Sequence, residues 1–397
     1  MTTKYIVLIA DGLGDEPLTE LRGKTPLEAA RTPNLDKLAK QSEVGLVHTI
    51  PDGFKPGSDV GTLSLLGYDP AEYYTGRAPL EAASMGVFLR KNEIAYRCNL
   101  VTVRGGILED YSAGHISTGD AKKLMKYLEQ KLGSKRIHFY PGVSYRHVVV
   151  IEDGPTTVAC VPPHDIQGKS IVNMLPAGDG SEVLLALMKQ SVILLRDHPV
   201  NIKRIYRDQD PANMIWLWGY GTAPNFSSFT DRFNLKGCVI SAVDLIRGIG
   251  KLLGLELIRV PGITGYFDTN YAGKAKYALK ALKKKDLVVV HVEAIDEAGH
   301  EGDMGAKIRA IEDFDKLVLG NVLKGLRTFP DHRLMVVADH PTPVARMTHT
   351  TDPVPYLIYS SRKKQKGPST FSEKTGEETG KRISVGHALM PAFLKTN

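Results

Sequence analysis

Acidic residues and a histidine follow three apolar, strand-like runs of the chain. Asp11 ends the run YIVLIAD, Asp296 follows LVVVHVEAI, and Asp339 and His340 follow LMVVA. Ligands bind outside the carboxyl ends of strands in open parallel sheets, so we expect these side chains at one sheet edge. Aspartate and histidine are ligands for divalent metals that keep open coordination positions. The three strand ends therefore predict a metal site.

Two more histidines extend this set. His300 lies four residues after Asp296, a spacing that places both side chains on the same face of a helical turn. His349 follows His340 closely in the segment THTTDPVP. Each feature alone is typical of a helix cap or a surface pair. All of them together, at strand ends, predict a metal cluster.

A serine is the candidate nucleophile. Ser58 follows Pro56 and Gly57 and precedes an amphipathic run, a pattern that predicts the first residue of a helix. An ordinary helix-capping serine is the alternative interpretation. Backbone N–H groups at a helix start bind phosphate oxygens, and an adjacent divalent cation lowers the pKa of a hydroxyl. Beside a metal cluster, Ser58 is thus suited to phosphoryl transfer.

The elements that position these residues alternate along the chain. Strand-like runs alternate with runs whose apolar residues recur at spacings of three and four. Such alternation predicts an α/β fold with a mostly parallel sheet and helices on both faces. The predicted strands are 5–10, 44–50, 286–292 and 333–338, and the predicted helices are 32–41, 242–254, 271–285 and 305–326.

The middle of the chain has a different pattern. It is rich in strand-like runs, at 94–103, 145–151 and 156–161, around a helix at 118–132 that Thr118 would cap. We predict a smaller α+β cap domain, 96–204, inserted into a discontinuous core domain formed by 1–95 and 205–397. Trp216 and Trp218 are expected to pack in the core or at a domain seam rather than stack on substrate.

Composition excludes several classes of protein. The 397 residues are 42% hydrophobic, enough for a sizeable core, and no run of about 18 apolar residues predicts a membrane span. The three cysteines stand far apart without metal-type spacing, which favours a reducing, cytoplasmic location.

The formal charge of +7 admits an anionic partner. The two basic runs of the chain, 280–286 and 361–382, lack interleaved aromatic residues and are expected to be solvated. We therefore expect a small anionic substrate as the partner, and neither nucleic acid nor a membrane. A homo-oligomer remains open.

Several motifs together carry a family resemblance. They are ADGLGD, PGSDVGTLSLLGYDP, TGRAPLEAASMG, YRCNLVTV, DYSAGHIST, VHVEAIDEAGHEGD, VADHPTP and THTTDPVP. The set resembles the cofactor-independent (2,3-bisphosphoglycerate-independent) phosphoglycerate mutases of the archaeal type, which belong to the alkaline phosphatase superfamily. The similarity runs from Tyr5 to about Tyr359 and returns at GHALMP.

The resemblance implies an alkaline-phosphatase-like core with two divalent metal ions, whose identity among Mn, Mg, Co and Zn stays open. Ser58 would attack the phosphorus of 3-phosphoglycerate and form a phosphoserine. The glycerate would then reorient and take the phosphoryl group on its 2-hydroxyl, a step of glycolysis and gluconeogenesis. By the same resemblance, one metal is held by Asp11, Ser58, Asp339 and His340, and the other by Asp296, His300 and His349.

The cap domain would bind glycerate and move a proton. Each of its arginines could instead form a structural ion pair. Two other functions remain open: a phosphomonoester or phosphodiester hydrolase of the same superfamily, and a catalytically inactive, metal-stabilised binding protein, against which the intact serine argues. The candidate substrate-binding residues are Arg77, Arg97, His115, Arg146, His164 and Asp165.

Overall fold

The structure is a computed structural model that describes residues 3–363 and 365–395. The chain forms two compact units. Met1–Tyr74 and Phe226–Asn397 make the first, which we call the core unit, and Thr75–Asn225 make the second, the inserted unit. The inserted unit is longer at both ends than the expected segment 96–204.

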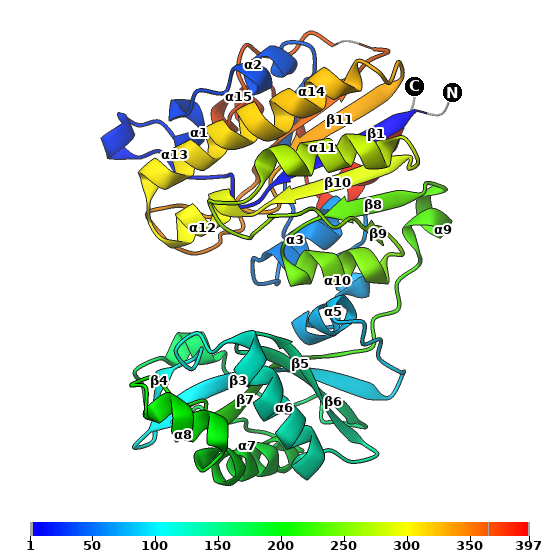
Figure 1. Cartoon of the computed structure of the whole chain (residues 1–397). Helices are drawn as coiled ribbons and strands as arrows, with labels where there is room; N and C mark the ends of the chain where they lie inside the picture. The colour runs from blue at the N-terminus through cyan, green and yellow to red at the C-terminus, as the bar shows by residue number, and fades with distance from the viewer. Residues whose placement is uncertain (1–2, 364, 396–397) are drawn as a thin grey trace. The chain divides into compact units, whose positions relative to one another are not determined.

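The described residues of the core unit form an eight-stranded sheet in the order β13-β2-β12-β11-β1-β10-β8-β9 (Figure 1). All its strand pairs are parallel except those of β12, which is antiparallel to both of its neighbours. The predicted α/β class with a mostly parallel sheet is confirmed. The strands are β1 (Lys4–Ala10), β2 (Glu43–Val47), β8 (Gly237–Ile240), β9 (Glu256–Leu257), β10 (Leu287–Val292), β11 (His332–Val337), β12 (Val354–Ser360) and β13 (Arg382–Ile383).

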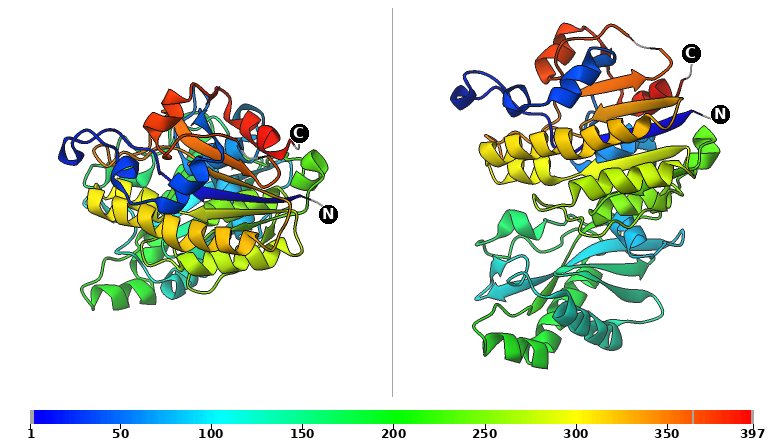
Figure 2. Two further views of the ribbon diagram at one scale, coloured as in Figure 1. Left: turned by 90° about the horizontal axis from the view of Figure 1, so that it is seen from above. Right: turned by 45° about the horizontal axis from the view of Figure 1, so that its top comes forward.

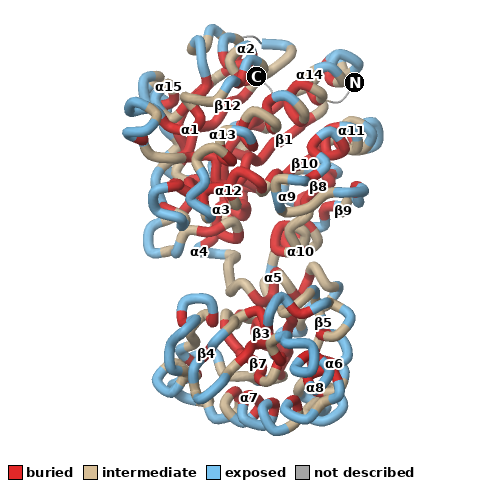
Figure 3. Tube along the Cα trace, turned by 60° about the vertical axis from the view of Figure 1, so that its left-hand side comes forward, coloured by how far each residue is buried: buried red, intermediate tan, exposed pale blue. Residues whose placement is uncertain are grey.

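Helices cover both faces of this sheet, which is why its central strands are apolar on both faces and almost wholly buried (Figure 3). Figures 1 and 2 show α11, α13 and α14 along one face, while α3 packs against α10 and α16. The helices are α1 (Pro26–Ala29), α2 (Pro33–Ala39), α3 (Ser58–Leu65), α4 (Pro70–Tyr73), α9 (Phe229–Phe233), α10 (Asp244–Leu252), α11 (Tyr271–Leu282), α12 (Ala294–His300), α13 (Met304–Asp313), α14 (Gly320–Leu326), α15 (Glu373–Glu378) and α16 (Leu389–Leu394).

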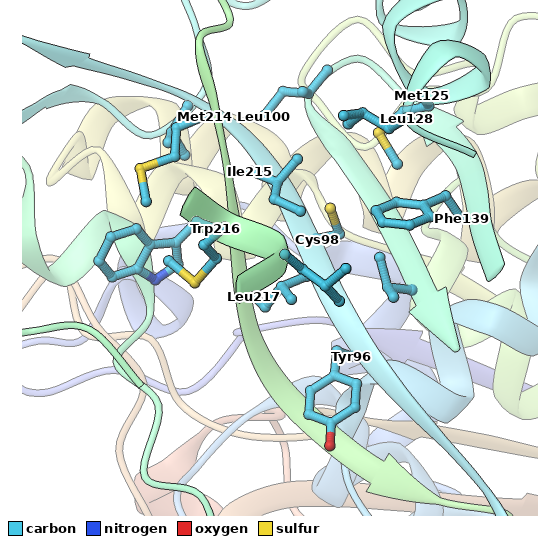
Figure 4. Close-up of a cluster of buried hydrophobic side chains, with 14 of the residues drawn as sticks. Tyr96, Cys98, Leu100, Met125, Leu128, Phe139, Met214, Ile215, Trp216 and Leu217 are labelled. Atoms are coloured by element: carbon cyan, nitrogen blue, oxygen red, sulfur yellow. The ribbon is translucent and has the colours of Figure 1, made fainter. Parts of the chain in front are cut away.

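The inserted unit is built on an antiparallel sheet in the order β4-β3-β6-β5, with β7 also pairing with β3. Its core contains Trp216, which is fully buried and donates its indole N–H to the carbonyl of Val161 at 2.8 Å (Figure 4). Its elements are β3 (Glu93–Arg104), β4 (Ile107–Asp110), β5 (Ile137–Val143), β6 (Arg146–Glu152), β7 (Met214–Thr222), α5 (Arg77–Ser84), α6 (Thr118–Leu132), α7 (Ser181–Arg196) and α8 (Pro199–Ile205).

Three local expectations need correction. The unit boundaries move outward because α5 packs on β3 and β7, and β7 itself pairs with β3. The predicted strand 156–161 is absent, and only an isolated bridge joins Ala159 to Ala177 there. Ser117 rather than Thr118 caps α6, and its side chain accepts the backbone N–H of Asp120. No helix among the described residues is long and apolar enough to cross a membrane.

A candidate metal centre at the strand ends of the core unit

Three adjacent parallel strands, β10, β1 and β11, end at the same edge of the core sheet. Asp11 follows β1 directly, and Asp339 and His340 follow β11 after one residue. Asp296 and His300 lie on α12, which begins immediately beyond β10. The structure therefore brings together the acids that the sequence places at separate strand ends.

The histidine nitrogens face the carboxylates at short range. His300 Nε2 is 3.3 Å from Asp296 Oδ2, and His349 Nε2 is 3.5 Å from Asp296 Oδ1. The Nε2 atoms of His300 and His349 are 2.8 Å apart, so both rings are directed at one point. His340 Nε2 lies 3.5 Å from Asp11 Oδ1. All predicted metal-ligating residues thus lie in one cluster.

These side chains fit divalent cations. In the described part of the chain, the ligand atoms of Asp296, His300 and His349 all lie within 4.8 Å of one another, and so do those of Asp11, Asp296 and His340. Asp11 Oδ1 and Asp339 Oδ2 are buried without a hydrogen-bond partner among the described residues. Burying a carboxylate oxygen without a donor is unfavourable, and a coordinated cation would remove that cost.

The pKa values of these side chains also indicate that the cluster needs positive charge. Burial raises the pKa of Asp11 well above its usual range, and the charges of Asp339 and Asp296 raise it further. Burial also raises the pKa of Asp296, but hydrogen bonds to His300 and His349 outweigh it and bring the value well below normal. The bond to Asp296 raises the pKa of His300 to about 9. Because a metal needs the neutral imidazole, cation binding would release protons here.

Ser58 is the first residue of α3, as its sequence context predicts, and Gly57 precedes it as the N-cap. Its Oγ lies 3.1 Å from His340 Nε2, at the border of the ligand cluster. The hydroxyl is only partly buried, so a substrate can approach it. A nucleophile beside ligands for divalent cations is the arrangement that phosphoryl transfer requires.

The predicted cap-domain arginines lie in the inserted unit. Arg97, on β3, is buried and donates Nε–H to Glu81 at 2.9 Å, while its guanidinium lies 3.9 Å from the ring centroid of Trp218. Arg77, at the start of α5, donates to the other oxygen of Glu81 at 3.2 Å. Both guanidinium groups are thus anchored by one carboxylate, and Arg77 has the more exposed side chain of the two.

Aromatic rings join the other candidates to this pair. The His164 ring is 5.3 Å from that of Trp218 and 6.2 Å from that of Tyr111, and Nε2 of His164 is 3.6 Å from Asp165. Tyr111 packs edge-on against Tyr145. The remaining two candidates, His115 and Arg146, both contact the Tyr145 ring. The six predicted substrate-binding residues therefore form one cluster, rich in cations, within the inserted unit.

The chain is similar to known proteins along nearly all its length. The model of the 2,3-bisphosphoglycerate-independent phosphoglycerate mutase family matches residues 39–201. A mutase of that name from Methanosarcina barkeri is 50% identical over 96% of both chains, and a probable one from Geobacter sulfurreducens is 48% identical over 98% of this chain and 99% of its own. The chain belongs to this family of phosphoglycerate mutases. The resemblance stated from the motifs, and the prediction of an enzyme, are confirmed.

Solved structures with a similar fold are also known. A Pyrococcus horikoshii protein is 30% identical, with a TM-score of 0.81 over 99% of this chain and 97% of its own. A cofactor-independent phosphoglycerate mutase from Thermoplasma acidophilum is 28% identical, with a TM-score of 0.68 over 99% of both chains. The two-unit fold is therefore shared with a mutase of this kind.

Two residues at the centre of this mutase were missed by the sequence reasoning. His291, inside β10, is fully buried, and its Nε2 lies 3.1 Å from Asp11 Oδ2, the carboxylate oxygen that faces away from His340. Thr342 donates its hydroxyl to Asp296 Oδ1. A polar residue inside the apolar run VVVHV was a usable signal for His291. Nothing in the sequence distinguishes Thr342 from an ordinary loop threonine.

Proposed function

We propose that the chain interconverts 3-phosphoglycerate and 2-phosphoglycerate through a phosphoserine on Ser58, without 2,3-bisphosphoglycerate. The observation that carries the proposal is the 3.1 Å approach of Ser58 Oγ to His340 Nε2, at a helix start beside two groups of metal-ligating side chains. The names of relatives that cover nearly the whole chain support the choice of substrate.

Two divalent cations would be held by these side chains. When bound, they would neutralise charge on the transferring phosphoryl group and lower the pKa of the serine hydroxyl. The mixed carboxylate and imidazole donors suit Mn²⁺, Co²⁺, Zn²⁺ or Mg²⁺, and the choice stays open. One cation would take Asp11, Ser58, Asp339 and His340, and the other Asp296, His300 and His349.

The serine would act twice. Its Oγ loses its proton and bonds to phosphorus while the bond from phosphorus to O3 of the substrate breaks, and O3 takes up a proton. The 2-hydroxyl of the glycerate then loses a proton and attacks the phosphoserine, and Ser58 Oγ leaves and takes up a proton again. Backbone N–H groups at the start of α3 are placed to hold the phosphoryl oxygens in both steps.

The inserted unit would bind the glycerate. We propose that the guanidinium groups of the half-exposed Arg77 and the exposed Arg146 bind its carboxylate, because arginine forms paired hydrogen bonds with that group. Arg97 would keep Trp218 and Glu81 in place around them. His115, or His164 with Asp165, would carry the proton between the two hydroxyls, because an imidazole can both accept and donate a proton.

Product analysis tests the proposal against its two alternatives. The protein is incubated with 3-phosphoglycerate and Mn²⁺, without 2,3-bisphosphoglycerate, and both 2-phosphoglycerate and free phosphate are measured. Formation of 2-phosphoglycerate with little phosphate supports the mutase. Phosphate alone would assign a hydrolase, and neither product would assign an inactive binding protein. Ser58→Ala is the control and should form neither product.

The proposal also covers the partner, the cellular location and the oligomeric state of the enzyme. The partner is a small phosphorylated acid rather than nucleic acid or a membrane. The three free cysteines support the proposed cytoplasmic location. A homo-oligomer is compatible with this function and is not required by it, because all proposed ligands come from one chain.

A further inference from the structure

Lys307 is a completely buried lysine whose ammonium group has three partners. It lies in α13, its side chain has no exposed surface, and its Nζ donates to Asp15 Oδ2 at 2.7 Å. The other two bonds go to backbone carbonyls, Thr342 O at 2.8 Å and Gly14 O at 3.2 Å. An ammonium group has three donors, so every one of them is used.

These partners belong to the loops that carry the metal ligands. Gly14 and Asp15 lie in the loop that begins with Asp11, after β1. Thr342 lies two residues beyond His340, in the loop after β11. The two loops also bond to each other, because the Thr342 backbone N–H donates to Gly14 O at 3.1 Å. Lys307 therefore joins the two strand ends from the side of α13.

The third strand end is reached through Thr342. Its hydroxyl donates to Asp296, the ligand on α12. The Asp15 carboxylate extends the connection further along the β11 loop, because its Oδ2 also accepts the backbone N–H of Val344 at 3.2 Å. One side chain outside the ligand set thus contacts, directly or through one residue, every strand end that delivers a ligand.

Stability alone does not explain a lysine at this position. Its neighbours on the buried face of α13 are Ala306, Ala310 and Ile311, an ordinary apolar helix face. Replacing a buried ion pair with well-packed apolar residues is often neutral or stabilising. A lysine fixes the positions of three acceptors in a way that an apolar side chain cannot.

We infer that Lys307 is a positioning residue of the metal centre, which sets the spacing between the ligands of the β1 and β11 loops and, through Thr342, of Asp296. The inference rests on the proposed two-metal function. Partners that orient metal ligands typically change metal affinity by 10- to 100-fold when they are removed. Lys307 acts one step further from the ligands, through the loop backbone.

The test compares Lys307→Met with a matched control. Methionine keeps much of the length and removes the charge and all three donors. The control is Asp315→Asn, because Asp315 is also a fully buried polar residue but accepts bonds from Asn34 and Leu35, which lie outside the strand-end loops. Mn²⁺ affinity is measured from the electron paramagnetic resonance signal of the free ion, and stability by urea unfolding.

We expect Lys307→Met to bind Mn²⁺ about 10-fold more weakly than the unmodified chain, at Mn²⁺ concentrations where both are folded. Asp315→Asn should lose stability and keep its Mn²⁺ affinity within about twofold. A Lys307→Met protein with unchanged Mn²⁺ affinity would overturn the inference, and so would an equal loss of affinity in the control.

A second variant tests the positioning role of Lys307 if Lys307→Met does not fold. Asp15→Asn leaves the lysine and its two carbonyl bonds in place; it weakens the ion pair and the bond that the same carboxylate accepts from the Val344 backbone N–H. It should fold and show a smaller but measurable loss of Mn²⁺ affinity, and an unchanged affinity there rejects the role of Lys307. Failure of the proposed function gives a different result, because the unmodified chain itself would then bind no Mn²⁺ or form no 2-phosphoglycerate.

Discussion

Gly61 offers a direct way to move one proposed metal ligand, Asp339. It lies on α3, one turn after Ser58, against the backbone of Asp339. A Cβ at this position would lie 2.4 Å from Asp339 O and 3.0 Å from Asp339 C, where ordinary contacts begin at 3.4 Å. The obstructing atoms are backbone and cannot rotate away. Gly61→Ala must therefore displace Asp339 relative to α3 by about 1 Å.

The expected effects on stability and on activity differ in size. Alanine is favoured over glycine within a helix by about 0.5–1 kcal/mol, and overpacking of a core costs about 1–3 kcal/mol. The free energy of unfolding should therefore fall by about 1–2 kcal/mol. A displacement of about 1 Å at a catalytic centre can cost about 100-fold in rate. We expect kcat to fall by about that factor in a protein that remains folded.

The assay is the rate of 2-phosphoglycerate formation at saturating Mn²⁺, together with urea unfolding. Gly119→Ala is the matched control, because Gly119 lies within the first turn of α6 and an added Cβ meets only Ser117 Oγ at 3.9 Å. It should leave the rate nearly unchanged and raise the free energy of unfolding by no more than about 1 kcal/mol. If Gly61→Ala keeps kcat within twofold of the unmodified enzyme, the placement of Asp339 in the metal centre is refuted.

Three further outcomes are expected. Thr342→Val removes the hydroxyl donor to Asp296 and should weaken Mn²⁺ binding by about 10-fold, measured by titration; an unchanged affinity would contradict this. Arg97→Met removes the buried one of the two guanidinium partners of the partly buried Glu81 and should lower the free energy of unfolding by about 3–5 kcal/mol, whereas a loss under about 1 kcal/mol in urea unfolding would show that the pair is not needed. Burial raises the pKa of Glu373 from 4.5 to about 7, so the folded state keeps its proton to higher pH than the unfolded state and the free energy of unfolding should fall as pH rises from 4.5 to about 7. Glu373→Gln should abolish this fall in urea unfolding over the same interval, and a fall of equal size in the variant would reject the cause.

The sequence predicts the central part of the core unit well, for a physical reason. β1, β10 and β11 are buried on both faces, so they appear as mostly apolar runs, with His291 as the polar residue inside β10. Because a buried strand tolerates little charge, Asp11 and Asp339 stand out where each run stops. The positions of the proposed ligands could therefore be predicted from local pattern and resemblance together.

Other features depend on contacts between distant parts of the chain. Lys307 contacts Asp15 and Thr342, and no local pattern signals that this helical lysine is buried. The segment 361–382, expected to be solvated, contains α15, from which Glu373 accepts the Asp15 backbone N–H; Lys364 of this segment lies outside the described residues. The boundaries of the inserted unit likewise depend on pairing of β7 with β3, which joins the two ends of the segment.

The central claim is that Ser58 carries the phosphoryl group between the two hydroxyls of glycerate. Rapid acid quench of the Mn²⁺-loaded enzyme with 3-phosphoglycerate, followed by mass spectrometry of its peptides, tests it most directly. We expect phosphoserine at Ser58 within the first turnover, formed no more slowly than 2-phosphoglycerate, and none in Ser58→Ala. An active enzyme without that phosphopeptide, whose Ser58→Ala variant still interconverts the phosphoglycerates, would contradict the account.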